Sequence, residues 1–296
     1  MTGRAPLRRP VATRPFPRRT VPIRPTRRGR RIRRASAGLS PVRAGAALAM
    51  LASAFAIYGV ANSSAFAYEQ LRIEGAGLTA PADIEAALQD IRGQNLFRLT
   101  TGPSEAALRE LATVADAIVS VRLPDTILVR VEERVPILVW AVGARRYLVD
   151  ETGALFTRAD DAPTADVATL PVIEDRRAAS AGLSVGRSID PVDLDAATRL
   201  ASLVPADVGS AAQSLSVIVS DASGFVLRAK PDGWDAVFGF YTASLRTPEL
   251  VPGQVRLLRS LVIGRESAID RIILASDTDG TYIPKATPSP SPTPEP

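Results

Sequence analysis

The sequence predicts an α+β protein that consists of a basic tail, one membrane-spanning helix and two folded modules. Residues 44–68 form a run of 25 residues without a charged side chain. After this run, some segments alternate apolar and polar residues, as strands do, and others have an apolar residue every three or four positions, as helices do. Helices that cover one face of a sheet are typical of an α+β fold.

The uncharged run would be about 37 Å long as a helix, enough to cross a hydrocarbon core of about 30 Å. We expect the membrane helix over residues 44–67. The alternative is a signal peptide, because Ala65-Phe66-Ala67 fits the pattern of small residues before a cleavage site. The run is longer than the usual apolar part of a signal peptide, about 7–15 residues. We therefore favour a permanent anchor over cleavage after Ala67.

Charge divides the chain at the same place. Residues 1–43 hold 14 arginines and no acidic residue, and the remainder holds the other 22 basic and all 31 acidic side chains, a net charge of −9. Positive charge beside a span keeps that end in the cytoplasm. We expect residues 1–43 to be a disordered cytoplasmic tail attracted to anionic lipid. The acidic remainder would lie outside, and specific nucleic-acid binding is not expected.

The composition excludes several kinds of chemistry. The chain has no cysteine and no histidine, which excludes disulfides, thiolate or imidazole metal ligands and a Ser-His-Asp triad. Asp277-Thr278-Asp279-Gly280 resembles the start of a calcium loop, but the later ligands are missing, so it predicts a hairpin turn. The pairs Asp160-Asp161 and Asp193/Asp195 are expected to be solvated or capping. We expect no enzyme activity, no cofactor and no metal.

Residues 68–135 are predicted to form a first module in the order strand, helix, helix, strand, strand. Alternation over 68–74 predicts the first strand. Thr79 is expected to cap the first helix and Ser104 the second. Two apolar-alternating strands follow, on either side of a Pro124-Asp125 turn. Two helices could then cover one face of a three-stranded sheet.

Residues 136–283 are predicted to form a larger module of several strands and two helices. Asp190 is expected to start a helix that ends at Pro205. A second helix is expected over Leu250–Leu261, and both tryptophans of the chain are expected in the core. Residues 284–296 alternate proline with serine and threonine, which predicts an extended, solvated tail.

The ordered segments resemble the FtsQ/DivIB family of cell-division proteins. The similar segments are Arg122-Leu123-Pro124-Asp125-Thr126-Ile127, Val131-Glu132-Glu133-Arg134-Val135-Pro136, Gln94-Asn95-Leu96-Phe97, and Trp140 followed by residues 147–156. One segment departs from the family, because its frequent Asp-Leu-Arg is replaced by Ile272-Ile273-Leu274. The resemblance covers about residues 44–283. It implies a POTRA domain over 68–135 and a β-domain over 136–283.

The resemblance also implies a function. It implies a non-catalytic scaffold of the division machinery, anchored in the cell membrane at the septum. The implied partners are homologues of FtsB and FtsL, with the septal peptidoglycan synthase as a further candidate. In that family the edge formed by the final strands receives a partner strand by β-augmentation. By position, that edge is one of two strands, Arg271, Ile272, Ile273 and Leu274 or Thr281, Tyr282 and Ile283.

Two further expectations complete the sequence-based picture. Proline at Ile273 is expected to abolish partner binding while membrane insertion persists. The alternative function is a secreted or envelope POTRA protein that handles substrates in transit. Proteins of that kind usually carry tandem POTRA modules and a terminal run of barrel strands, whereas this chain has one such module before a proline-rich tail. Membrane retention would favour the scaffold, and a soluble species beginning near Tyr68 would favour the alternative.

Overall fold

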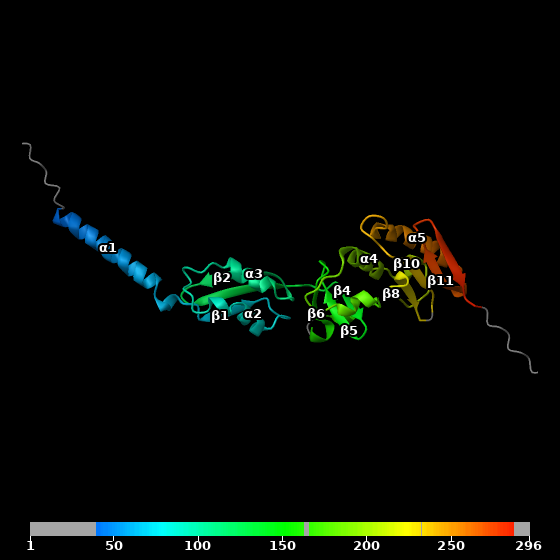
Figure 1. Cartoon of the computed structure of the whole chain (residues 1–296), viewed down its shortest axis with the longest axis horizontal. Helices are drawn as coiled ribbons and strands as arrows, with labels where there is room; N and C mark the ends of the chain where they lie inside the picture. Colours follow the sequence, from blue (N-terminus) through cyan, green and yellow to red (C-terminus); the bar gives the residue numbers. More distant parts are fainter. Residues whose placement is uncertain (1–39, 163–165, 232, 287–296) are drawn as a thin grey trace, which may run out of the picture. The chain divides into compact units, whose positions relative to one another are not determined.

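The computed structural model describes residues 40–162, 166–231 and 233–286 (Figure 1). Most of the predicted basic tail (1–43) and of the proline-rich tail (284–296) lies outside these residues. The chain divides into two compact units between Phe55 and Ala56.

Helix α1 (Pro41–Ala61) is the one helix in the described residues that is long and apolar enough to cross a membrane. It ends six residues before the expected end of the span. The Asn62 amide donates a hydrogen bond to the carbonyl of Tyr58 at 2.7 Å. The Ser63 hydroxyl donates to the carbonyl of Val60 at 2.8 Å. The same carbonyls also accept the backbone N–H groups of Asn62 and Ser63, so the two side chains add local bonds at the point where the helix ends.

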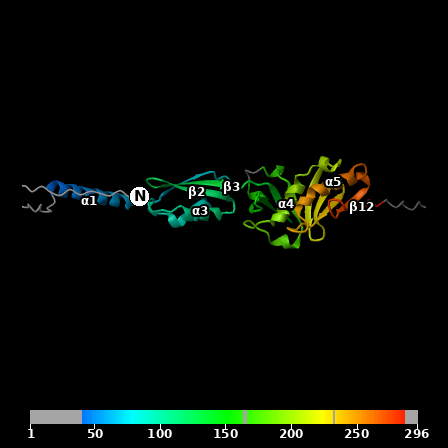
Figure 2. The ribbon, with the colours of Figure 1, turned by 90° about the horizontal axis from the view of Figure 1, so that it is seen from above.

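The first module is a three-stranded sheet in the order β1-β3-β2, in which β1 is parallel and β2 antiparallel to β3. Helices α2 and α3 lie on one face, and α3 is seen below β2 and β3 in Figure 2. Ile84, Leu108 and Ile127 are fully buried between the helices and the sheet. The predicted βααββ order is confirmed. The elements are η1 (Ser64–Phe66), β1 (Gln70–Glu74), α2 (Pro81–Ala87), η2 (Gln89–Ile91), α3 (Gly102–Arg109), β2 (Val114–Arg122) and β3 (Thr126–Glu133).

The two helix caps predicted in this module are wrong. Helix α2 begins after Ala80, and the Thr79 hydroxyl forms a hydrogen bond with that of Thr113 at 2.7 Å. Helix α3 begins after Thr101, so Ser104 lies inside its first turn. Both helices have a proline in the first turn. The fixed φ of proline favours a helix start, and its missing N–H removes one donor that a cap would otherwise satisfy.

The second module is a nine-stranded mixed sheet in the order β12-β11-β10-β9-β8-β7-β4-β5-β6. The pairs β4–β7, β7–β8 and β10–β11 are parallel. Helices α4 (Pro191–Ala201) and α5 (Val251–Val262) cover one face. The strands are β4 (Leu138–Val142), β5 (Arg145–Val149), β6 (Leu155–Arg158), β7 (Val172–Asp175), β8 (Ser214–Ser220), β9 (Gly224–Lys230), β10 (Asp235–Gly239), β11 (Ile269–Leu274) and β12 (Gly280–Pro284). The remaining short 3-10 helices are η3 (Ala159–Asp161), η4 (Val167–Thr169), η5 (Ala178–Gly182), η6 (Pro205–Val208), η7 (Pro248–Leu250) and η8 (Glu266–Ala268).

The predicted start of α4 is confirmed, since the Asp190 carboxylate accepts a hydrogen bond from the backbone N–H of Val192 at 2.9 Å. The helix ends at Ala201, four residues before the expected Pro205, which instead begins a 3-10 turn. Trp140 and Trp234 are fully buried, as expected. A continuous apolar core therefore joins the sheet to α4 and α5.

Candidate functional site

Strand β12 is an edge of the large sheet. Among the described strands it pairs only with β11, and all five of its residues are exposed. Strand β11 lies between β10 and β12, so it is not an edge. Of the two strands that the sequence offered as the docking edge, Arg271–Leu274 is inside the sheet, and Thr281, Tyr282 and Ile283 form its rim.

Two hydrogen bonds define which backbone groups of β12 point toward β11. At the turn, the N–H of Ala275 donates to the carbonyl of Asp279 at 2.9 Å. At the other end, the N–H of Lys285 donates to the carbonyl of Ala268 at 2.9 Å. Because backbone groups of a strand alternate in direction, the odd-numbered residues between these two points face β11.

The even-numbered residues of β12 therefore present their backbone groups to the free side. These are Gly280, Tyr282 and Pro284. Proline has no N–H, so the free side carries two outward N–H donors, those of Gly280 and Tyr282. An unpaired row of this kind is a template for another strand.

The side chains beside the edge are apolar on both faces of the sheet. Tyr282 lies opposite Ile272, which is fully buried on the α5 side, so the exposed part of Tyr282 borders α5. Ile283 lies opposite Arg271, on the face away from the helix. Tyr282 is 43% and Ile283 45% exposed. A strand added at this edge would contact one apolar side chain on each face.

The edge is held in place by polar side chains from the segment before α5 and from α5 itself. One Arg246 amino group donates to the carbonyls of Phe238 and Leu274 at 2.6 and 2.8 Å. Gln254 is fully buried, accepts a hydrogen bond from the Tyr241 hydroxyl at 2.7 Å, and reaches the same two carbonyls. Burial raises the pKa of Tyr241 above its ordinary value, which keeps the hydroxyl a donor. These contacts tie the ends of β10 and β11 together.

Sequence reasoning missed this group of three residues. Arg246 lies in a loop without periodicity, so no pattern marked it. Gln254 did carry a signal, because it is a polar residue on the face of α5 that buries Val251, Leu258 and Val262. A buried amide on an apolar helix face requires hydrogen-bond partners.

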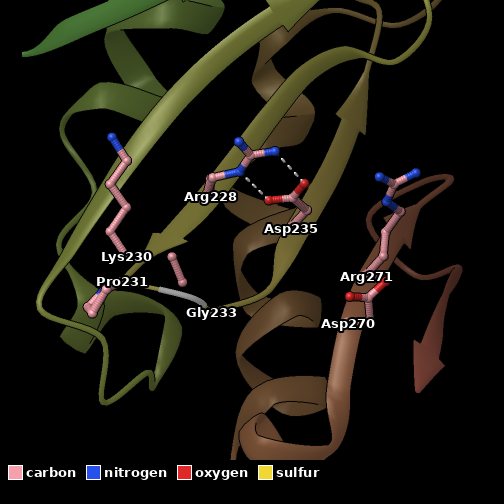
Figure 3. Close-up of a pocket in the computed structure, with 8 residues that line it drawn as sticks. Arg228, Lys230, Pro231, Gly233, Asp235, Asp270 and Arg271 are labelled. Atoms are coloured by element: carbon pink, nitrogen blue, oxygen red, sulfur yellow. Dashed lines mark hydrogen bonds and ion pairs between the residues drawn. The ribbon is translucent and has the colours of Figure 1, made fainter. Parts of the chain in front are cut away.

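A pocket of about 530 Å³ lies near the edge (Figure 3). Arg228 and Asp235 form a bidentate ion pair on its wall, at 2.7 and 2.8 Å. Arg271 lies opposite Asp235 in the next strand. Within the described residues, neither the Arg271 guanidinium nor the Lys230 ammonium takes part in an ion pair. Asp270 also lines the pocket, so its three basic and two acidic side chains leave one net positive charge, and Arg271, opposite Ile283, is its lining cation nearest to β12.

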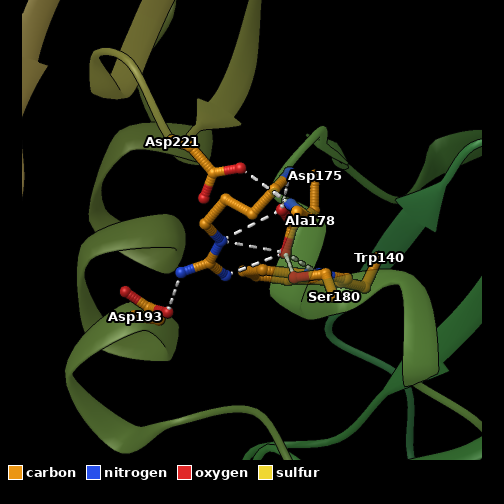
Figure 4. A network of polar contacts seen from close by, with 7 residues as sticks. Trp140, Asp175, Ala178, Ser180, Asp193 and Asp221 are labelled. Atoms are coloured by element: carbon orange, nitrogen blue, oxygen red, sulfur yellow. Dashed lines mark hydrogen bonds and ion pairs between the residues drawn. The ribbon is translucent and has the colours of Figure 1, made fainter.

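A second cluster of polar side chains surrounds the buried carboxylate of Asp175 in the large module (Figure 4). Its carboxylate accepts hydrogen bonds from the Trp140 indole at 3.0 Å, the Ser180 hydroxyl at 2.5 Å and the Arg177 guanidinium at 2.8 Å. Arg177 also pairs with Asp193 at 2.5 Å. Burial alone would raise the pKa of Asp175, but the bonds from Arg177 and Ser180 outweigh it and hold the pKa below its usual value. Both carboxylate oxygens accept hydrogen bonds from several donors, which stabilise the ionised form.

The other acidic pairs have local roles. Asp193 holds Arg177, Asp195 pairs with Arg199 at 2.7 Å one helical turn later, and Asp160-Asp161 forms a short 3-10 helix. Residues 277–280 close the predicted hairpin between β11 and β12. In the part of the chain that the structure describes, no three acidic residues are grouped as metal ligands would be.

Comparison with known proteins agrees with this architecture. The sequence model "POTRA domain, FtsQ-type" matches residues 66–134. The cell division protein FtsQ of Chloroflexus aurantiacus is 27% identical over 248 residues, which cover 83% of this chain and 80% of that protein. The FtsQ of Streptomyces venezuelae is 31% identical over 48% of this chain and 52% of its own length. The FtsQ of Caulobacter vibrioides is 37% identical over 36% of each chain. The FtsQ-type POTRA match and the FtsQ relatives make this chain similar to the FtsQ/DivIB family of cell-division proteins.

Proposed function

We propose that this protein is a non-catalytic scaffold of the division machinery whose β12 edge receives a strand from a partner of the FtsB/FtsL type. The observation that carries the proposal is the row of outward backbone groups at Gly280 and Tyr282. Strand addition takes its affinity from main-chain hydrogen bonds and its specificity from flanking side chains. Tyr282 and Ile283 supply an apolar contact on either face of the added strand.

Positive charge beside the edge indicates that the partner strand carries acidic side chains. Arg271 lies one strand in from the edge, opposite Ile283 on the side away from α5, and has no ion-pair partner among the described residues. A partner strand with acidic side chains on that face would be attracted and correctly oriented. We expect the FtsB homologue of the same organism to provide such a strand, and recruitment of FtsL and of the septal peptidoglycan synthase would follow through that contact.

The proposed topology has the basic tail in the cytoplasm and both folded modules outside. The 14 arginines before the span support it, since basic residues stay on the cytoplasmic side. The chain has no cysteine, so one cysteine can be introduced at a time, at Ala37 or at the exposed Ser244. On intact cells a membrane-impermeant maleimide should label the Ser244→Cys variant and not the Ala37→Cys variant. The reverse pattern would contradict the topology.

A permanent anchor is supported by the way the segment after α1 joins the first module. The Phe66 carbonyl accepts a hydrogen bond from the N–H of Leu96 at 2.8 Å, and Ala67 forms a β-bridge with Asn95. Cleavage after Ala67 would remove these contacts. Fractionation should find the full-length chain in the membrane, and a soluble species that begins near Tyr68 would favour the envelope-protein alternative.

The edge is tested at Tyr282. A Tyr282→Pro variant loses the outward N–H but leaves the hydrogen bonds toward β11, and proline is tolerated on edge strands. A Tyr282→Ala variant keeps the N–H and loses only the side chain. Pull-down of the FtsB homologue by the full chain should be lost in the first variant and only reduced in the second, with mid-cell localisation of a fluorescent fusion as a second readout.

Unchanged pull-down by Tyr282→Pro would refute the proposal, provided that the variant's thermal unfolding matches the wild type. Equal loss in both variants would show that the side chain, and not the backbone, carries binding. The Ile273→Pro substitution suggested by sequence is less informative, since Ile273 lies between two strands, β10 and β12. A proline there would damage the sheet itself.

A further inference from the structure

The loop Gly93–Arg98, between η2 and α3, is fixed to the end of α1. The Asn95 side-chain amide donates to the carbonyl of Ala61, the last residue of the helix, at 2.8 Å. The N–H of Tyr68 donates to the carbonyl of Gln94 at 2.9 Å. Together with the bridge at Ala67, these bonds hold the loop beside the chain as it leaves the helix.

This loop exposes one large apolar side chain and buries the next one. Leu96 is 3% exposed and belongs to the core of the first module. Phe97 is 54% exposed, and its ring centroid lies 4.8 Å from that of Phe66 in an edge-to-face arrangement. Phe97 therefore packs against Phe66 and leaves about half of its surface exposed, while Leu96 fills the core.

Phe97 continues the apolar surface of the last turns of α1. An open hollow of about 510 Å³ is lined by Phe97 together with Ala56, Ile57, Val60 and Ala61. Every one of these side chains is apolar. In a helix that spans a bilayer, Ile57 and Val60 would contact lipid, so a lipid chain in this hollow would contact Phe97 as well.

The length of α1 places the hollow and Phe97 near the outer boundary of the hydrocarbon core. The 21 residues of α1 are about 31 Å long, close to the thickness of a hydrocarbon core of about 30 Å. Ile57 lies one helical turn before the end of α1, which is the outer boundary of the hydrocarbon. Tyr58, 64% exposed, lies at the same depth, where aromatic residues of membrane proteins gather. Arg92 and Arg98 are exposed on either side of Phe97, where their guanidinium groups can reach lipid phosphates.

We propose that the loop Gly93–Arg98 seats the POTRA domain on the membrane, with Phe97 inserted at the boundary between acyl chains and headgroups of the outer leaflet. The occupant of the hollow is lipid, because the hollow is continuous with the lipid-facing surface of α1. The inference rests on the proposed function in one respect, that α1 is a permanent span. It adds a second attachment, which limits how the first module can tilt away from the membrane.

Single-cysteine variants of the full chain test this proposal. Phe97→Cys probes the loop, Leu51→Cys probes the middle of α1, and Ile118→Cys is the matched control, because Ile118 is 51% exposed on β2. Each variant is spin-labelled and reconstituted in vesicles of phosphatidylethanolamine and phosphatidylglycerol. Accessibility to oxygen, which concentrates in lipid, is compared with accessibility to a water-soluble nickel chelate.

The label at Phe97 should favour oxygen over nickel, as the label at Leu51 does, and the label at Ile118 should favour nickel. If Phe97 behaves like Ile118 while Leu51 lies in lipid, the loop does not enter the membrane and the proposal is overturned. If the label at Phe97 is shielded from both reagents, it packs against protein and the proposal is equally overturned. If Leu51 itself favours nickel, the anchoring on which both proposals depend has failed.

Discussion

The Trp140 indole donates a hydrogen bond to the Asp175 carboxylate across 3.0 Å in a part of the large module that is closed to water. Trp140 is on β4 and Asp175 at the end of the neighbouring β7. The same carboxylate holds Arg177, whose other arm reaches Asp193 on α4. One buried anion thus connects the sheet to the helix that covers it.

We predict a large loss of stability for Asp175→Ala. Arg177 keeps its pair with Asp193, but the buried Trp140 indole and Ser180 hydroxyl lose their acceptor, at about 1–3 kcal/mol for each group left unpaired. The control is Asp195→Ala, which breaks an exposed helical pair with Arg199 and should cost below about 1 kcal/mol. Urea unfolding of the two variants followed by circular dichroism measures the difference. Equal losses would mean that the buried network around Asp175 stabilises the fold no more than an exposed ion pair does.

A second prediction concerns pH and Glu133, at the end of β3. Its carboxylate accepts hydrogen bonds from the N–H groups of Gly77, Leu78 and Thr79 at 3.0, 2.8 and 2.7 Å. Burial would raise the pKa of Glu133, but the bonds from Leu78, Thr79 and Gly77 outweigh it and lower the pKa. A lowered folded-state pKa stabilises the fold above the ordinary pKa of about 4.3, and the stabilisation is lost as pH falls through the folded value.

Glu133→Gln should therefore remove a part of the stability that depends on pH. The free energy of unfolding of the wild type should exceed that of the variant most at pH 7, and the two should converge as the pH falls below the ordinary pKa. Urea titrations over this range test the prediction. If the difference in free energy of unfolding between the wild type and the variant did not change with pH, the negative charge of Glu133 would not be what stabilises residues 77–79.

A third prediction links the interior to the edge. Gln254→Leu leaves the Tyr241 hydroxyl without its buried acceptor, a loss of about 1–3 kcal/mol. Because Gln254 also reaches the carbonyl of Leu274, the register of β11 against β10 should loosen. We expect faster hydrogen exchange in β11 and β12 and weaker binding of the FtsB homologue. Ser260→Ala, at an exposed position of the same helix, is the control and should change neither measurement.

Local sequence signals predicted most of the helices and strands. The order of the strands in the sheet, and the residues that hold its edge, depend on contacts between residues far apart in the sequence. Asp190 caps α4 because capping involves residues two or three positions apart. The choice between Arg271–Leu274 and Thr281–Ile283 as the edge depended on β11 pairing in parallel with β10, which no local pattern specifies. Arg246 and Gln254 donate hydrogen bonds to the backbone carbonyl of Leu274. Every residue has a backbone carbonyl, so the sequence does not indicate which one such a side chain will bind.

The last prediction concerns Gly253, in the first turn of α5. A Cβ at this position would lie 2.5 Å from the Cβ of Asp277, in the turn that joins β11 to β12. Gly253→Ala should therefore displace either the helix or the turn, at a cost of about 1–3 kcal/mol, and it should weaken partner binding because β12 follows that turn directly. Gly102→Ala is the matched control, because Gly102 also lies in a first helical turn but has nothing within 4 Å of its Cβ position. It should be neutral or slightly stabilising, since alanine loses less backbone entropy on folding. Thermal unfolding and pull-down of the two variants, measured side by side, would contradict this account if Gly253→Ala behaved like Gly102→Ala in both.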